Sequence, residues 1–197
     1  MNLIGGLINI KKYNYKEETM IDLFHYTDKQ QDEIIKSLTV LVDTREHDGK
    51  NDHILNYFDK AEIPYKKRKL EYGDYSFMIP ANESLAIPRD LDFSHKIIVE
   101  RKASLEELSG NLTQERERLE KEMALAPDVK VIMIENGTYA DLVNGNYGTK
   151  YSNKSFWASY HSLWHKYNVP IIFMPDKSFS GFFIRGFFTY YLKNYMK

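Results

Sequence analysis

Three acidic residues stand at the ends of apolar runs, and a lysine accompanies one of them. Asp43 and Glu100 end such runs, Asp74 begins one, and Lys102 follows Glu100 by two residues. A lone charge at the tip of an apolar strand is costly to bury, whereas a bound divalent cation compensates it and takes carboxylate oxygens as preferred ligands. Because the strand tips of one sheet can converge on one ion, the pattern predicts a Mg²⁺ or Mn²⁺ site with Asp43, Asp74 and Glu100 as ligands.

The spacing around Glu100 also predicts which groups share the site. Residues two apart in a strand leave the same face, so Glu100 and Lys102 would lie together while Arg101 points to the other face. In phosphodiester hydrolysis a metal ion polarises the phosphoryl oxygen and acidifies its bound water, and a neighbouring lysine orients that water or stabilises the developing charge. These residues therefore predict metal-assisted hydrolysis of a phosphodiester, with Lys102 near the attacking water.

The same residues fall in three motifs that resemble the nuclease domain of the XPF/Hef type. The motifs are VDTRE at residues 42–46, GDY at 73–75 and VERK at 99–102. The resemblance covers about residues 38–197 and implies a restriction-endonuclease-like fold in which an Asp and a Glu-x-Lys hold the metal. It also implies a structure-specific endonuclease acting on branched, flapped or junction DNA in recombination or repair, and a homodimer.

Further site residues follow from the resemblance. It places Glu46 among the acids of the metal site, and Arg101 completes its Glu-Arg-Lys signature. The family carries another acidic residue shortly after the lysine, for which Glu106 has the expected spacing and is the predicted choice. Glu107 fits if one residue is inserted, but with Ser104 it also has the form of a capping box that would start the next helix.

Arg116 lies in the middle of the apolar stripe of that helix, between Leu112 and Leu119. An arginine on a buried face needs a partner. The resemblance implies an arginine near this place, so Arg116 is predicted to reach the scissile phosphate or an active-site carboxylate. The alternative is an internal salt bridge.

Strands and helices alternate along the chain, which predicts a single α/β domain with a central mixed sheet flanked by helices. Strands are expected at residues 38–43, 66–70, 74–79, 96–101, 129–135 and 170–174, and helices at 27–37, 52–61, over about twenty residues after Lys102, around 156–167 and at 178–195. Residues 1–37 would form an N-terminal extension with a short helix, and 38–197 the nuclease domain. The Gly-, Asn- and Tyr-rich segment 144–153 predicts a loop that could serve as a mobile flap.

Composition limits the possible partners. With 27 Lys and Arg against 28 Asp and Glu, the formal charge is -1, so any DNA contact must come from local patches. The absence of Cys leaves oxygen or histidine as metal ligands, and no membrane span or secretory signal is visible. We therefore expect a cytoplasmic protein of a bacterial, archaeal or phage-infected host cell.

Three other groups of residues permit more than one interpretation. The basic run 66–69 would contact a phosphate backbone or form a solvated sheet edge. The aromatic cluster 179–195 would seal the core or a dimer interface. Five histidines lack the spacing of a zinc site and are expected to be structural or surface residues, namely His47, His53, His95, His161 and His165.

The leading prediction is a divalent-metal-dependent DNA endonuclease. One alternative is a catalytically inactive DNA-binding or regulatory module of the same fold, whose signature would be the loss of the acidic motifs. Those motifs are present. Another is a nuclease of the same broad fold that acts on DNA ends or on a particular sequence, which a panel of nicked, flapped, forked and four-way DNA would distinguish.

Overall fold

The computed structural model describes residues 21, 25–46 and 49–197. Within them the strands are β1 (Thr39–Val42), β2 (Tyr65–Lys67), β3 (Tyr75–Ile79), β4 (Leu91–Asp92), β5 (Ile97–Lys102), β6 (Val129–Glu135) and β7 (Ile171–Met174), and the helices are α1 (Asp28–Ser37), α2 (Asp52–Lys60), α3 (Leu105–Gln114), α4 (Arg116–Leu125), α5 (Tyr139–Asn144), α6 (Asn153–Tyr167) and α7 (Ser180–Tyr195). The predictions for residues 1–20 and for His47 lie outside the described residues.

One mixed sheet forms the middle layer. Its strand order is β2-β1-β3-β5-β6-β7, with β4 paired to β3 beside this path. β1 runs parallel to β2 and antiparallel to β3, and β3 runs antiparallel to β5, which is followed by parallel β6 and β7. The C-terminal ends of β1 and β5 and the N-terminal end of β3 therefore meet at one edge of the sheet.

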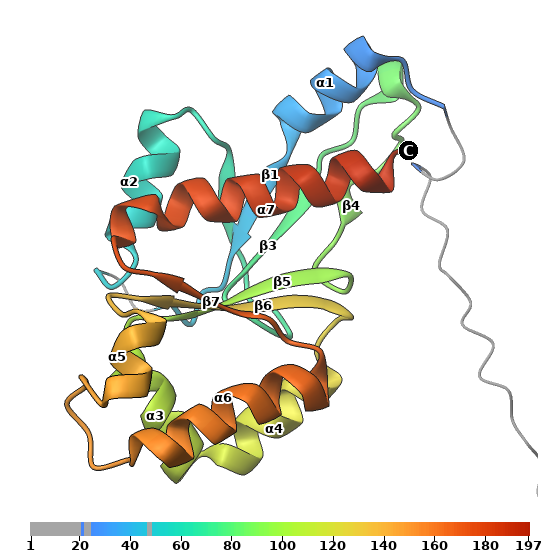
Figure 1. Ribbon diagram of the computed structural model, residues 1–197. Coiled ribbons are helices and arrows are strands. Elements are labelled where there is room, and N and C mark those ends of the chain that lie inside the picture. The colour runs from blue at the N-terminus through green and yellow to red at the C-terminus, as the bar shows by residue number, and fades with distance from the viewer. Residues whose placement is uncertain (1–20, 22–24, 47–48) are drawn as a thin grey trace, which may run out of the picture.

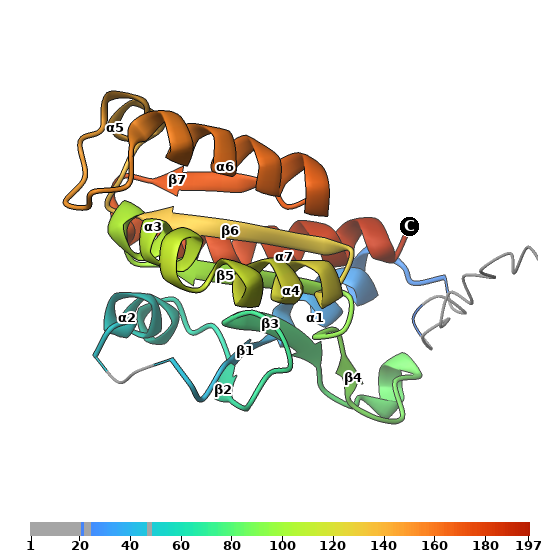
Figure 2. The same cartoon turned by 90° about the horizontal axis from the view of Figure 1, so that it is seen from below.

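Helices cover both faces of this sheet. Figure 1 shows α1, α2 and α7 on one face and α3, α4, α5 and α6 on the other, and Figure 2 shows α3 and α4 lying across β5 and β6. Alternate residues of β6 enter opposite cores: Val131 and Met133 pack on the α7 side, whereas Ile132 and Ile134 pack on the α6 side. The period-two alternation of a strand thus explains why β6 reads as a continuous apolar run.

The predicted fold class is confirmed, with local differences. The expected twenty-residue helix is two helices, because Glu115 between them has non-helical angles (φ −129°, ψ 27°). The short helix α5 was not predicted, although Thr138 and Asp141 form a capping box at its start. β2 is an exposed edge strand, as in the solvated-edge interpretation of the basic run, and Arg68 beyond it pairs with Asp92 at 2.7 Å. None of the described helices has the length and apolar character needed to cross a membrane.

Candidate active site

A cleft of about 470 Å³ opens where the ends of β3 and β5 meet the side of α4. It is lined by Arg45, Glu71, Tyr72, Gly73, Asp74, Glu100, Lys102, Arg118, Lys121, Glu122 and Leu125. Two of the three predicted metal ligands, Asp74 and Glu100, therefore lie in one cavity together with Lys102. The cleft joins residues from four separate segments of the chain.

Gly73 allows the two strands of the cleft to approach each other. Its φ is +68°, and a Cβ atom there would lie 2.9 Å from the side chain of Ile98. Only glycine accepts this conformation and this close approach without strain. As a result the Asp74 N–H donates to the Val99 carbonyl at 3.0 Å, which fixes Asp74 beside β5.

Asp74 and Glu100 each keep one carboxylate oxygen available. Asp74 Oδ2 accepts from the Arg101 N–H at 2.7 Å, and Glu100 Oε1 accepts from Lys102 Nζ at 2.7 Å. Among the described residues, no hydrogen bond reaches Asp74 Oδ1 or Glu100 Oε2. Burial and the neighbouring Glu100 and Glu46 carboxylates raise the pKa of Asp74 well above its usual range. The cleft therefore contains two carboxyl groups, each with one oxygen that accepts no hydrogen bond from the described residues.

Lys102 is the buried cation of this cluster. Burial alone would lower the pKa of its amine, but the carboxylates of Glu100 and Asp74 raise it above its usual value. The amine therefore stays protonated at neutral pH. The predicted sharing of one face by Glu100 and Lys102 is confirmed by their hydrogen bond.

Asp43 lies at the same edge of the sheet but is fully engaged elsewhere. Its side chain is 1% exposed. Oδ1 accepts from the Arg45 N–H at 2.6 Å and from Nε at 3.0 Å, while Oδ2 accepts from Arg45 Nη2 at 2.8 Å and from the Leu70 N–H at 2.9 Å. Burial would raise the pKa of Asp43, but these hydrogen bonds hold it below its usual value.

The structure therefore brings two of the three predicted ligands together and engages the Asp43 carboxylate with Arg45. In the part of the chain that the structure describes, no three acidic or histidine side chains are arranged to hold one ion. The physical reason is that the Arg45 guanidinium compensates the charge of Asp43. Asp74 and Glu100 remain as the pair of carboxylates that face the cleft.

Arg101 leaves the opposite face of β5, as its position in the strand predicts. Its Nη2 is 2.7 Å from Glu135 Oε2 and donates to the Lys50 carbonyl at 2.9 Å, and its Nη1 is 3.6 Å from Glu46 Oε2. His53 Nε2 lies 2.7 Å from the other oxygen of Glu135. This buried network ties β5, β6 and α2 to the segment that carries Glu46.

Glu135 was missed by the sequence analysis. It is completely buried and ends the apolar strand β6 in the same way that Glu100 ends its own run. That pattern was visible in the sequence and could have identified it. Glu46, which was predicted, has a buried side chain, and burial raises its pKa while Arg101 lowers it.

The two candidates for the later acid have different partners. Glu106 accepts from the Gly148 N–H at 2.8 Å and so anchors loop 145–152. Glu107 accepts from the Ala103 N–H at 2.9 Å, and its Oε1 lies 3.8 Å from Lys102 Nζ. Of the two, Glu107 is the acid that approaches the cluster while it also holds the start of α3, whereas the predicted Glu106 binds the loop.

Arg116 forms the internal salt bridge of the alternative interpretation. Its Nε donates to Glu120 at 2.7 Å and its Nη1 to the Ser159 hydroxyl at 3.3 Å. Arg116 is exposed and does not line the cleft. The helix break at Glu115 means that the apolar side of α4 does not continue the apolar side of α3 through Arg116. Arg118, paired with Glu115, lines the cleft instead.

The sheet order, with helices on both faces, defines a mixed α/β domain whose cleft holds two carboxyl groups and a lysine. The model of the ERCC4 domain matches residues 42–187, and the chain belongs to the ERCC4 domain family. This confirms the resemblance to the XPF/Hef-type nuclease domain.

Two solved structures share the fold. XPF from Aeropyrum pernix has a TM-score of 0.56 and 19% identity over 78% of this chain and 61% of its own. XPF from Aeropyrum pernix in complex with DNA has a TM-score of 0.57 and 19% identity over 79% of this chain and 66% of its own. The chain thus spans less than two thirds of either solved chain. No curated protein matches it significantly.

Proposed function

We propose that the chain is a DNA endonuclease that hydrolyses phosphodiester bonds with the help of Mg²⁺ or Mn²⁺. The observation that carries the proposal is the convergence of Asp74, Glu100 and the protonated Lys102 in one cleft. Membership of the ERCC4 domain family supports it. So does the likeness in fold to XPF from Aeropyrum pernix in complex with DNA. By the same resemblance, the substrate would be branched, flapped or junction DNA in recombination or repair.

The donor set of the cleft fits a hard divalent cation. Mg²⁺ in nucleotide-processing sites is commonly bound through one or two carboxylates, with water and substrate phosphate completing its shell. The Asp74 Oδ1 and Glu100 Oε2 atoms are the oxygens that would hold it. When bound, such an ion polarises the phosphoryl group and makes its water more acidic.

The protein groups around these oxygens would position and stabilise the substrate. Lys102 is protonated, so it would stabilise negative charge on the phosphate and cannot accept a proton from water. Arg45, Arg118 and Lys121 line the same cleft and would contact the flanking phosphate groups. The Arg101 N–H would keep Asp74 oriented through its hydrogen bond.

Charge removal at the two proposed ligands tests the proposal. Glu100→Gln and Asp74→Asn keep the shape of the side chain but remove the anion, so each should reduce cleavage by roughly a hundredfold or more, as losses of groups that stabilise a transition state do. The assay is cleavage of labelled flapped, forked, nicked, four-way and linear DNA in Mg²⁺ and in Mn²⁺. Glu117→Gln, an exposed residue of α4, is the matched control and should cleave normally.

Melting temperatures would show that the variants are folded. Wild-type cleavage by Glu100→Gln would refute the proposed site. DNA binding without cleavage of any substrate in either metal would favour the inactive DNA-binding module.

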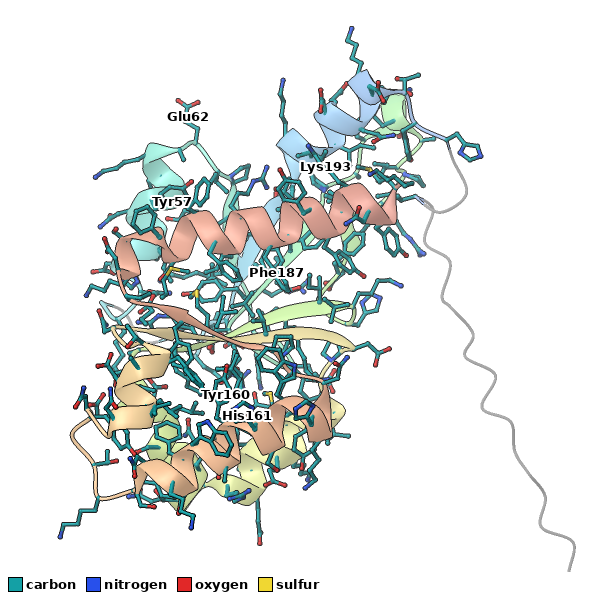
Figure 3. All side chains as sticks on the ribbon, viewed as in Figure 1. Tyr57, Glu62, Tyr160, His161, Phe187 and Lys193 are labelled. Atoms are coloured by element: carbon teal, nitrogen blue, oxygen red, sulfur yellow. The ribbon has the colours of Figure 1, made fainter. Side chains whose placement is uncertain are left out.

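We also propose that the chain forms a homodimer through α7. Phe182 and Tyr190 are 64% and 67% exposed on this helix. They border an apolar groove of about 580 Å³ that also includes Phe187, and Figure 3 labels Phe187 on the side of α7 nearest the sheet. Exposed apolar patches of this kind commonly mark protein interfaces, and the interface alternative for the aromatic cluster is consistent with this surface.

A further inference from the structure

One stripe along the exposed side of α6 carries aromatic and basic side chains at helical spacing. Lys154, Trp157, His161, Trp164 and His165 recur three or four positions apart and therefore share one face. Trp157 and Trp164 are 46% and 38% exposed, although tryptophan is usually largely buried. Figure 3 shows His161 on α6 beside Tyr160. We call these five residues the α6 stripe.

The rings of the α6 stripe are held in fixed positions. Trp157 Nε1 donates to the Tyr139 hydroxyl at 2.7 Å, and the same hydroxyl lies 3.2 Å from His161 Nε2. The rings of Trp157 and His161 have centroids 4.6 Å apart. Beneath them Tyr160 is buried and stacks on Phe173 of β7 at 5.8 Å. The exposed rings therefore rest on a rigid base, which lowers the entropy cost of binding a partner.

The α6 stripe presents a lysine and no acidic side chain, which suits a polyanion. The helix sequence NKSFWASYHSLWHKY contains no acidic residue, and of its two lysines Lys166 is paired with Glu120 of α4 at 2.6 Å, which leaves Lys154 as the lysine of the stripe. Asp141 of the adjacent α5 is engaged by Thr138 and Asn146. Charged residues are depleted from the cores of protein interfaces, so a second copy suits the phenylalanine-rich groove of α7 better than it suits this stripe.

The α6 stripe is connected to the segment that follows Lys102. The Asn136 side chain before α5 donates to the Ala103 carbonyl at 3.0 Å, and loop 145–152 before α6 is bound by Glu106 of α3. Figure 1 shows α5 and the start of α6 on the same side of the molecule, next to α3. A chain lying on the stripe would therefore extend toward the edge of the sheet that holds the cleft.

We propose that the α6 stripe binds single-stranded DNA, with bases stacked on Trp157 and Trp164 and phosphates beside Lys154 and the two histidines. Exposed aromatic rings for bases combined with cations for the backbone are the general features of surfaces that bind single strands without sequence preference. The inference rests on the proposed function in one respect, because the bound strand would be a single-stranded part of the DNA substrate.

The chain contains two tryptophans, and both belong to the stripe, so tryptophan emission excited selectively over that of the tyrosines reports on this surface. The full chain is titrated in EDTA with an oligothymidylate of roughly 12 nucleotides, within the usual site size. Stacking should quench the tryptophan emission, whereas heparin, which has charge but no bases, should leave it largely unchanged. In fluorescence anisotropy with a labelled oligonucleotide, Trp157→Ala and Trp164→Ala should each weaken binding about tenfold.

Phe182→Ala on α7 is the matched control, since it removes an equally exposed ring from another surface and should bind the oligonucleotide normally. Equal quenching by heparin, or unchanged affinity of both tryptophan variants, would overturn the proposal. So would a concentration-dependent emission shift without DNA that disappears in Trp164→Ala, because a second copy would then cover the stripe.

This experiment is independent of the cleavage assay. If the wild type cleaves DNA and Glu100→Gln does not, a failure of oligonucleotide binding refutes the stripe alone. If the tryptophan variants lose binding while the wild type cleaves no substrate in either metal, the endonuclease proposal fails and the stripe remains.

Discussion

At the scale of residues, the sequence predicted which side chains belong to the site better than it predicted the groups that each of them binds. The acidic motifs and the facing of Glu100 and Lys102 followed from strand periodicity. The engagement of Asp43 by Arg45 did not, because a turn between residues two apart has no fixed side-chain direction. Asp43 is therefore better described as a group that holds the turn after β1 against the Leu70 backbone.

The pH dependence of stability tests this role of Asp43. Its pKa is lowered in the folded protein, so its contribution to stability is present above the unfolded pKa near 3.9 and is lost as pH falls through the lower folded value. Asp43→Asn should cost about 1.5–3 kcal/mol at pH 7, the range for hydrogen bonds to a charged group. Its deficit relative to wild type should shrink below about pH 4.

Urea unfolding of the wild type and of Asp43→Asn at pH 7 and below about pH 4 measures the difference in their free energies of unfolding. Asp32→Asn, an exposed residue of α1, is the control and should be neutral at both. A deficit that is the same at both pH values would show that the charge of Asp43 is not what stabilises the turn.

At the scale of elements, the long periodic segments were predicted, whereas the short α5 and β4 were not. β6 was predicted with its observed bounds because seven apolar-rich residues end at a turn. α5 has six residues and β4 has two, so neither shows a full period. The break between α3 and α4 was marked only by Arg116 standing where the apolar stripe required an apolar residue. Tertiary packing, which a single sequence does not display, decides such cases.

The buried network around Glu135 joins three elements, so its contribution to stability can be tested at this scale. Glu135→Gln would leave the Arg101 guanidinium without its buried partner, and breaking a buried ion pair costs about 3–5 kcal/mol. Chemical denaturation should show this loss. Glu117→Gln, exposed on α4, should change stability by less than about 0.5 kcal/mol. A variant as stable as wild type would mean that the network does not hold β5, β6 and α2 together.

At the scale of the whole molecule, two sides of one sheet present different surfaces. α7 offers an apolar aromatic groove, whereas α6 offers aromatic rings beside a lysine and two histidines. Composition had indicated that DNA contacts must be local because the formal charge is only -1. The uneven distribution of charge over the helices agrees with that expectation. The sequence could not show this distribution, because packing decides which face of each helix is exposed.

The proposed homodimer is tested on the intact chain. Phe182→Ser combined with Tyr190→Ser makes the exposed side of α7 polar and should shift the mass from dimer to monomer in sedimentation equilibrium. Trp157→Ser on α6 is the control and should leave the mass unchanged. A wild-type chain that is monomeric at high concentration would contradict the α7 interface, and a dimer lost only in the control would place the interface on α6.

The turn before Asp74 affects how much the site would have to rearrange when it binds a cation. Gly73 packs against Ile98 with no room for even one more carbon atom, and the hydrogen bond from the Asp74 N–H to the Val99 carbonyl holds the segment beside its neighbour. The Asp74 oxygen proposed to hold the ion is therefore positioned by this contact and by the hydrogen bond from the Arg101 N–H before any ion binds. Binding of the cation would then require little rearrangement. Less of the binding free energy would therefore be lost in ordering the site, and more would remain to stabilise the transition state.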